Sequence, residues 1–96
     1  MARFKLTLDA LNDLRDIARY TGQQWGREQR NQYLAEIDKR FHWLAESPEL
    51  AVERDDIKSG YRCFPQGRHI IFFREQGTHI EILGVLHRNM DVKQRL

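Results

Sequence analysis

Residues 69–74 read HIIFFR and are apolar at the four consecutive positions Ile70 to Phe73. Neighbouring side chains of a strand point to opposite faces, so a run of this kind is apolar on both faces of a sheet. Aromatic and β-branched residues favour strands, and polar turn segments at 66–68 and 76–77 bound the run. The pattern predicts a strand at 69–75, in the middle of a sheet.

Two more strands are predicted beside this one, at 61–65 and 79–87. Both segments are rich in aromatic and β-branched residues, and Gln66-Gly67-Arg68 and Gln76-Gly77 read as the hairpin turns that join them to 69–75. Plain alternation along 79–87 places residues 80, 82, 84 and 86 on one face and the odd-numbered residues on the other. One of these faces is expected to be core against the helical hairpin, and the other is mixed and is expected to line a concave working surface.

The first half of the chain has helical spacing instead. After a short alternating strand at 3–7, apolar residues recur at 11, 14, 17, 18, 21 and 25, one face of a helix that stops at Gly26. A second helix is predicted at 27–46, because Leu34, Ile37, Phe41 and Leu44 form one stripe and Ser47-Pro48 ends it. Since almost nothing joins the two helices, they should form an antiparallel hairpin.

These elements predict an α+β fold: an N-terminal strand, an antiparallel helical hairpin, then a three-stranded antiparallel meander that forms one sheet, with the hairpin on one face. Residues 49–60 are polar and charged, and we expect a surface connection there rather than an element. The strand order is left open. A chain of 96 residues supports one domain, 1–96.

Charge and composition exclude several classes of protein. The chain has 16 basic and 14 acidic residues, and each half has eight basic and seven acidic ones. This balance is unlike that of a protein that grips nucleic acid through phosphates, so it favours a protein partner over strong direct nucleic-acid binding. We find neither an apolar run able to span a bilayer nor a signal peptide, which predicts a cytoplasmic protein without membrane attachment.

Neither a metal site nor a cofactor is expected. Cys63 is the single cysteine, so an intramolecular disulfide cannot form. The four histidines, at 42, 69, 79 and 87, lie on different predicted elements and lack metal-binding spacing.

Several segments, taken together, resemble the toxins of the ParE branch of the ParE/RelE superfamily. They are LNDLRDIA at 11–18 with Trp25-Gly26, LAESP at 44–48, GYR at 60–62 with Phe64-Pro65, HIIFFR at 69–74 and ILGVLHRNM at 82–90 with Asp91. Each segment alone is common, but their order and spacing over nearly the whole chain are specific. The resemblance implies a RelE/ParE-like fold and a toxin that inhibits DNA gyrase. It also implies a ParD-type antitoxin that wraps the toxin in a hetero-oligomer.

RelE-like ribosome-dependent mRNA endonucleases, which share this fold, are the alternative. RNA cleavage needs clustered cationic groups with an acid or a base, and the candidates here are Arg62, Arg74, His87 and Arg88. The lysine-rich connection and C-terminal tyrosine of many such nucleases have no evident match, so we assign no catalytic residue. A plain peptide-binding module is the third possibility.

For gyrase binding we hypothesise a set of mostly cationic residues from the strands and the tail: Arg62, Arg74, His87, Arg88, Lys93, Arg95 and Leu96. The tail at 88–96 has three basic residues against one acidic residue, which suits an acidic surface or gyrase-bound DNA. It is predicted to run along or off the sheet. A frayed terminus is the alternative.

Trp43 is the hypothesised antitoxin anchor. On a helical wheel it lies nearly opposite the stripe of Leu34, Ile37 and Phe41, so it is expected to face away from the core. Exposed large aromatic residues often mark interfaces. The alternative is packing against the 49–60 connection.

Overall fold

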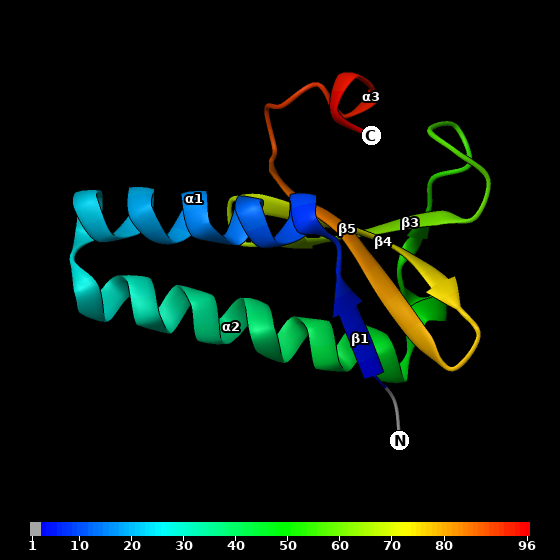
Figure 1. The fold of residues 1–96 in the computed structure, drawn as a ribbon, viewed down its shortest axis with the longest axis horizontal. Helices are drawn as coiled ribbons and strands as arrows, with labels where there is room; N and C mark the ends of the chain where they lie inside the picture. Colours follow the sequence, from blue (N-terminus) through cyan, green and yellow to red (C-terminus); the bar gives the residue numbers. More distant parts are fainter. Residues whose placement is uncertain (1–2) are drawn as a thin grey trace.

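The computed structural model describes residues 3–96 and begins with a short strand and two long helices. Strand β1 (Arg3–Leu6) leads into helix α1 (Leu8–Trp25), and helix α2 (Arg27–Glu46) follows. Thr7 caps α1, because its hydroxyl oxygen accepts a hydrogen bond from the Ala10 N–H at 3.1 Å. The two helices run antiparallel (Figure 1), which confirms the predicted hairpin.

Gly26 is the one residue between the helices. Its φ of +90° lies in a region that side chains with a Cβ rarely adopt. Its amide donates to the Gly22 carbonyl and so ends α1. An added Cβ would meet nothing within 4 Å, so the backbone conformation and not the available space requires glycine.

The sheet has five strands in the order β1-β5-β4-β3-β2, in which the edge strand β2 is Val52–Glu53. Strands β3 (Tyr61–Gln66), β4 (His69–Gln76) and β5 (His79–His87) form the predicted antiparallel meander, and β1 pairs with β5 in parallel. Strand β4 is central, as its apolar run predicted. The order that the sequence left open places the N-terminal strand beside the last one.

The prediction of an irregular connection at 49–60 was wrong for its first part. A 3₁₀ turn, η1 (Pro48–Leu50), is followed by the two-residue strand β2 (Val52–Glu53), which pairs with Cys63 and Arg62 of β3. Ala51 between them is buried. Two residues are too few to show an alternating pattern in the sequence. Strand β2 is defined only by its backbone pairing with β3.

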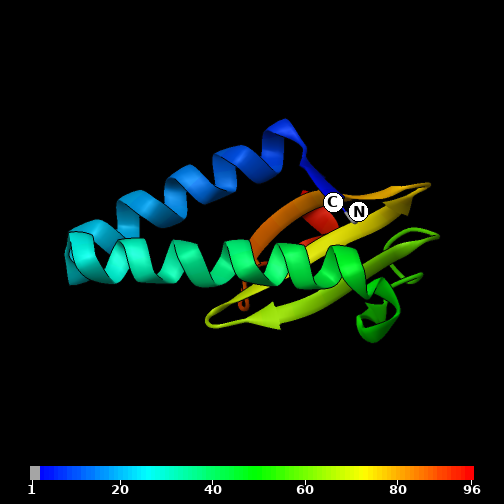
Figure 2. The same ribbon diagram turned by 90° about the horizontal axis from the view of Figure 1, so that it is seen from below.

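The main core lies between the helical hairpin and one face of the sheet. Figure 2 shows α2 running across that face. The buried residues of this core come from both helices, the residue before β2, and the two central strands: Ala10, Ile17, Ile37, Phe41, Leu44, Ala51, Ile71, Phe73, Ile80, Ile82 and Val85. The predicted stripe of α2 is therefore confirmed. The predicted stripe of α1 is correct only in part. Leu11 and Trp25 belong to it but are 37% and 59% exposed, whereas Ala10, which the stripe did not include, is buried.

A β-bulge reverses the predicted faces in the second half of β5. Phe72 pairs with Gly84 but Phe73 pairs with Ile82, so Leu83 is an extra residue on β5. Beyond the bulge Val85 joins the main core with Ile80 and Ile82, and Leu86 points to the other face. Plain alternation had placed Leu86 with Ile80 and Ile82, which is wrong.

The opposite face of the sheet has a smaller core. Tyr61, Cys63, Phe72, Leu83 and Leu86 form it, and we call it the second-face cluster. The C-terminal helix α3 (Val92–Arg95) lies against it, with Val92 and Leu96 packed on the cluster. Of the two predicted paths, the tail thus follows the one along the sheet and not the one off it, and it does so as a short helix.

Candidate functional site

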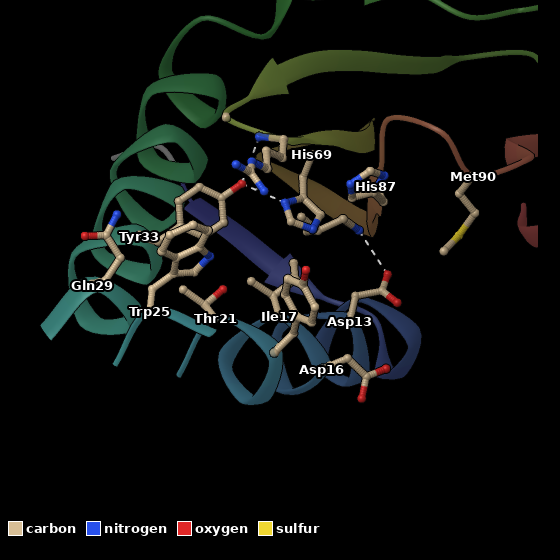
Figure 3. Close-up of a pocket in the computed structure, with 14 residues that line it drawn as sticks. Asp13, Asp16, Ile17, Thr21, Trp25, Gln29, Tyr33, His69, His87 and Met90 are labelled. Atoms are coloured by element: carbon tan, nitrogen blue, oxygen red, sulfur yellow. Dashed lines mark hydrogen bonds between the residues drawn. The ribbon is translucent and has the colours of Figure 1, made fainter. Parts of the chain in front are cut away.

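A groove of about 660 Å³ opens between the helices and the end of the sheet (Figure 3). Its lining comes from α1, α2, the β3–β4 turn and the end of β5, and we call it the α1–sheet groove: Asp13, Asp16, Ile17, Tyr20, Thr21, Trp25, Gln29, Tyr33, Gly67, Arg68, His69, Val85, His87 and Met90. The joined ends of the helices project beyond the sheet. Since no strand covers this part of α1, Tyr20 and Trp25 are left 58% and 59% exposed.

Tyr33 of α2 ties the helices to the β3–β4 turn. Its hydroxyl oxygen accepts a hydrogen bond from the Arg68 N–H at 3.1 Å and lies 3.1 Å from the Gln66 carbonyl oxygen. Gly67 has a φ of +59°, and an added Cβ would lie 2.6 Å from Cε1 of Tyr33. The close approach of the ring and the backbone conformation both require glycine here.

His69 and His87 face each other across β4 and β5 at the same end of the sheet. Their ring centroids are 5.6 Å apart, and the Tyr33 hydroxyl lies 2.6 Å from Nδ1 of His69. Burial lowers the pKa of His69 to about 4, and the charges of His87 and Arg68 add to the effect. Burial also raises the pKa of Tyr33. At neutral pH the Tyr33 hydroxyl and the His69 imidazole are therefore both uncharged and hydrogen-bonded to each other. Such a pair is better suited to holding the fold together than to transferring a proton.

Protonation of His69 is expected to destabilise the fold in acid. The pKa of His69 is depressed in the folded state to about 4, so between about pH 6.5 and pH 4 the unfolded chain binds more protons and stability falls as pH falls. We expect a loss of about 1 kcal/mol between pH 7 and pH 5, after allowing for solvent screening of a half-buried group. Urea unfolding at both pH values should show a smaller pH effect in His69→Asn than in the wild type. The exposed-histidine variant His42→Asn should behave like the wild type, and an unchanged pH effect in His69→Asn would contradict the assignment.

Arg62 and Arg74, two of the residues hypothesised to bind gyrase, lie on opposite faces of the sheet. Arg62 is opposite Phe73 on the helix side, and its Nη1 donates to the Ala51 carbonyl at 3.2 Å. Arg74 is opposite Tyr61 on the other face, and its Nε is 2.9 Å from Oε1 of Glu81. The structure does not bring these two side chains together.

His87 and Arg88 lie at the groove end of the sheet, by contrast. The Nδ1 of His87 accepts a hydrogen bond from the Asn89 N–H at 3.3 Å, and the Nε of Arg88 donates to the Gly67 carbonyl at 3.1 Å. Both side chains are exposed.

The three hypothesised residues of the tail differ in exposure. Lys93 points to solvent, whereas Leu96 packs on the second-face cluster. The Nη2 of Arg95 lies 2.7 Å from both carboxylate oxygens of Asp13 on α1. Arg95 and Leu96 thus already have partners within the chain.

Trp43 is 37% exposed and forms a stack at the end of α2. Its ring centroid is 5.1 Å from that of Phe64 on β3, and the Arg40 guanidinium lies 4.8 Å from the centroid of each ring. One side of the indole is therefore engaged within the fold, and part of it remains available to a partner.

Asp13 and Tyr33 are site residues that sequence reasoning missed. Their partners are distant in sequence: Asp13 contacts Val85 and Arg95, and Tyr33 contacts the 66–69 turn. A lone polar residue on a helix gives no sign of such a partner.

Within residues 3–96, no helix combines the length and the apolar character needed to cross a membrane. The same residues include no group of three or more histidine, cysteine, aspartate or glutamate side chains placed to hold a metal ion.

Comparison with known proteins gives consistent matches over nearly the whole chain. The family model described as the ParE toxin of the type II toxin-antitoxin system parDE matches residues 4–92. Toxin ParE1 of Caulobacter vibrioides is 34% identical over 96 residues, covering 100% of this chain and 99% of the relative. Toxin ParE1 of Mycobacterium tuberculosis is also 34% identical, over 99% of this chain and 98% of the relative.

Two solved structures share the fold. The chromosomal ParDE TA system from P. aeruginosa superposes with a TM-score of 0.76 at 22% identity, covering 91% of this chain and 96% of that one. The toxin-antitoxin complex RelBE2 from Mycobacterium tuberculosis gives a TM-score of 0.62 at 20% identity, covering 91% and 98%.

Proposed function

Since the chain belongs to the ParE toxin family of type II toxin-antitoxin systems, we propose that it inhibits DNA gyrase and is neutralised by a ParD-type antitoxin. In this proposal the toxin acts in the cytoplasm by binding gyrase and catalyses no reaction itself. Family membership supports the choice of target. The arrangement of the charged side chains supports binding over catalysis.

The observation that favours this function over mRNA cleavage is the dispersal of the candidate cationic groups. Of the four nuclease candidates, Arg62 and Arg74 are each within 3.5 Å of a carboxylate oxygen and lie on opposite faces of the sheet. Both lie at the other end of the strands from His87 and Arg88. RNA cleavage needs such groups to converge on one phosphate. The groove where His87 lies is also lined by the exposed carboxylate of Asp16, which would repel a phosphate.

We assign the antitoxin to the α1–sheet groove and to the adjoining helical hairpin. Tyr20, Trp25 and Met90 are each at least 50% exposed there, and exposed large apolar side chains gathered along a groove mark a protein interface. Arg68, with its guanidinium 5.8 Å from the Trp25 ring, supplies a cation on one wall, and Asp16 supplies an anion on the other. An amphipathic antitoxin segment with charges of both signs fits this lining. The ParDE system of P. aeruginosa, which shares the fold, is named as such a toxin-antitoxin pair.

The purified protein is expected to inhibit gyrase supercoiling, to increase cleaved gyrase–DNA complexes, and to leave mRNA intact in expressing cells. A stoichiometric amount of the ParD-type antitoxin should restore supercoiling. Plasmid supercoiling and primer extension on cellular mRNA are the two measurements. Codon-positioned mRNA cuts that disappear in His87→Ala, together with normal supercoiling, would establish the RelE-like alternative instead.

A further inference from the structure

An ion pair joins the C-terminal helix to α1. The Nη2 of Arg95 lies 2.7 Å from Oδ1 and Oδ2 of Asp13, whose side chain is only 14% exposed. Arg95 is 25% exposed, and its Nη1 is 3.5 Å from Oδ2 of Asp9. The guanidinium thus sits between two carboxylates of one helix, and a partly buried pair of this kind is screened less by solvent than a surface pair.

Asp13 also completes the edge of β5. Strand β1 ends opposite Ile82, so β5 has no strand neighbour on that side beyond this point. Oδ2 of Asp13 accepts the Val85 N–H at 3.0 Å in place of a strand carbonyl (Figure 3). An added Cβ at Gly84 would lie 3.3 Å from this oxygen, so a small residue lets the carboxylate approach. The backbone bond holds the carboxylate in place for Arg95.

Apolar contacts hold the other side of α3. Val92 and Leu96 pack on the second-face cluster, and the Leu96 N–H donates to the Val92 carbonyl at 2.9 Å. Asp91 caps the helix by accepting the Lys93 N–H at 3.1 Å. With Arg95 and Leu96 directed into the fold, Lys93 is the cationic side chain of α3 that faces solvent.

We propose that Asp13 is a positioning residue for the C-terminal segment: through Arg95 it fixes α3 on the sheet and orients Lys93 toward gyrase. Arg95 and Leu96 are then anchors within the toxin, and Lys93 makes the contact. This assignment rests on the proposed function, and it divides the hypothesised tail residues into two classes. It also explains why an aspartate in the second turn of α1 has partners more than 70 residues away.

The test measures tail docking and gyrase inhibition separately in the full-length toxin. Digestion by carboxypeptidase Y, followed by mass spectrometry, reports how fast Leu96 and Arg95 are released. Supercoiling assays report inhibition, and thermal unfolding confirms that each variant is folded. In Asp13→Asn and Arg95→Met, release should be about tenfold faster and inhibition about tenfold weaker, the effect of losing about 1.4 kcal/mol of docking.

Three further variants separate anchoring from contact. Arg95→Lys keeps the charge and should recover much of both properties, whereas Lys93→Ala should weaken inhibition without changing the release rate. Glu36→Gln and Arg19→Met alter exposed charges elsewhere on the helices and should match the wild type.

Two results would overturn the proposal. One is an unchanged release rate in Asp13→Asn, and the other is lost inhibition in Arg95→Met with the tail still docked. If the wild-type protein does not inhibit gyrase, the proposed function fails, and the release rates alone then decide whether Asp13 anchors the tail.

Discussion

Phe73→Ala is expected to lower the free energy of unfolding by about 3–5 kcal/mol, the usual cost of removing a buried aromatic ring from a core. Phe73 is fully buried in the central strand β4, within the core between the sheet and the helical hairpin. The surrounding side chains come from several elements, so they cannot all collapse into the space left by the ring. Urea unfolding followed by far-UV circular dichroism measures the change.

Val52→Ala is the matched control for this prediction. Val52 lies on the edge strand β2 and is 59% exposed, so its truncation should change stability by less than about 0.5 kcal/mol. A loss below about 1 kcal/mol in Phe73→Ala would show that the packing around β4 is looser than the structure indicates.

Phe73 also shows why the central elements could be predicted from sequence. A four-residue apolar run must be covered on both faces, and a strand covered on both faces belongs inside a sheet. The stripe of Ile37, Phe41 and Leu44 similarly fixed the buried face of α2, because period and burial coincide there. In both elements a short stretch of sequence was enough to determine which side chains are buried, so the prediction from sequence succeeded.

The faces of β5 show the limit of such inference. The bulge at Leu83 adds one residue, which shifts the phase of every side chain that follows. The sequence ILGVL contains a glycine, but nothing in it distinguishes a bulge from a regular strand. Only the register with β4 and the carboxylate of Asp13 near Gly84 reveal the reason.

The candidate site was harder to predict than the fold, because tertiary contacts assemble it. Met90 and Trp25 come from distant segments and meet at one groove, and their spacing in the sequence has no period. Residues 88–96 were predicted to bind gyrase from their net positive charge. Which of their cations is exposed depends on Asp13, 82 residues before Arg95.

The two tryptophans provide the second large effect that we expect. Trp25→Ala and Trp43→Ala should each weaken the toxin-antitoxin complex by about 2 kcal/mol or more, which is about 30-fold in affinity. Trp25 is 59% exposed beside the groove, and Trp43 is 37% exposed on its stack with Phe64 and Arg40. Exposed indoles of this kind bury a large apolar area at little entropic cost when a partner covers them.

The distance between the two tryptophans makes the prediction more specific. They lie 18 residues apart, close to the two ends of α2, which corresponds to about 27 Å along a helix. An antitoxin that wraps the toxin needs at least about eight extended residues to cover both. Because residues so far apart act independently, the double variant should lose the sum of the two single effects.

Calorimetric titration gives the affinities of the variants for the antitoxin. Unfolding of the free toxin separates loss of binding from loss of stability, since Trp43→Ala also removes a contact within the fold. A large effect for Trp25→Ala with less than about 0.5 kcal/mol for Trp43→Ala would confine the antitoxin to the groove and leave Trp43 a purely structural role.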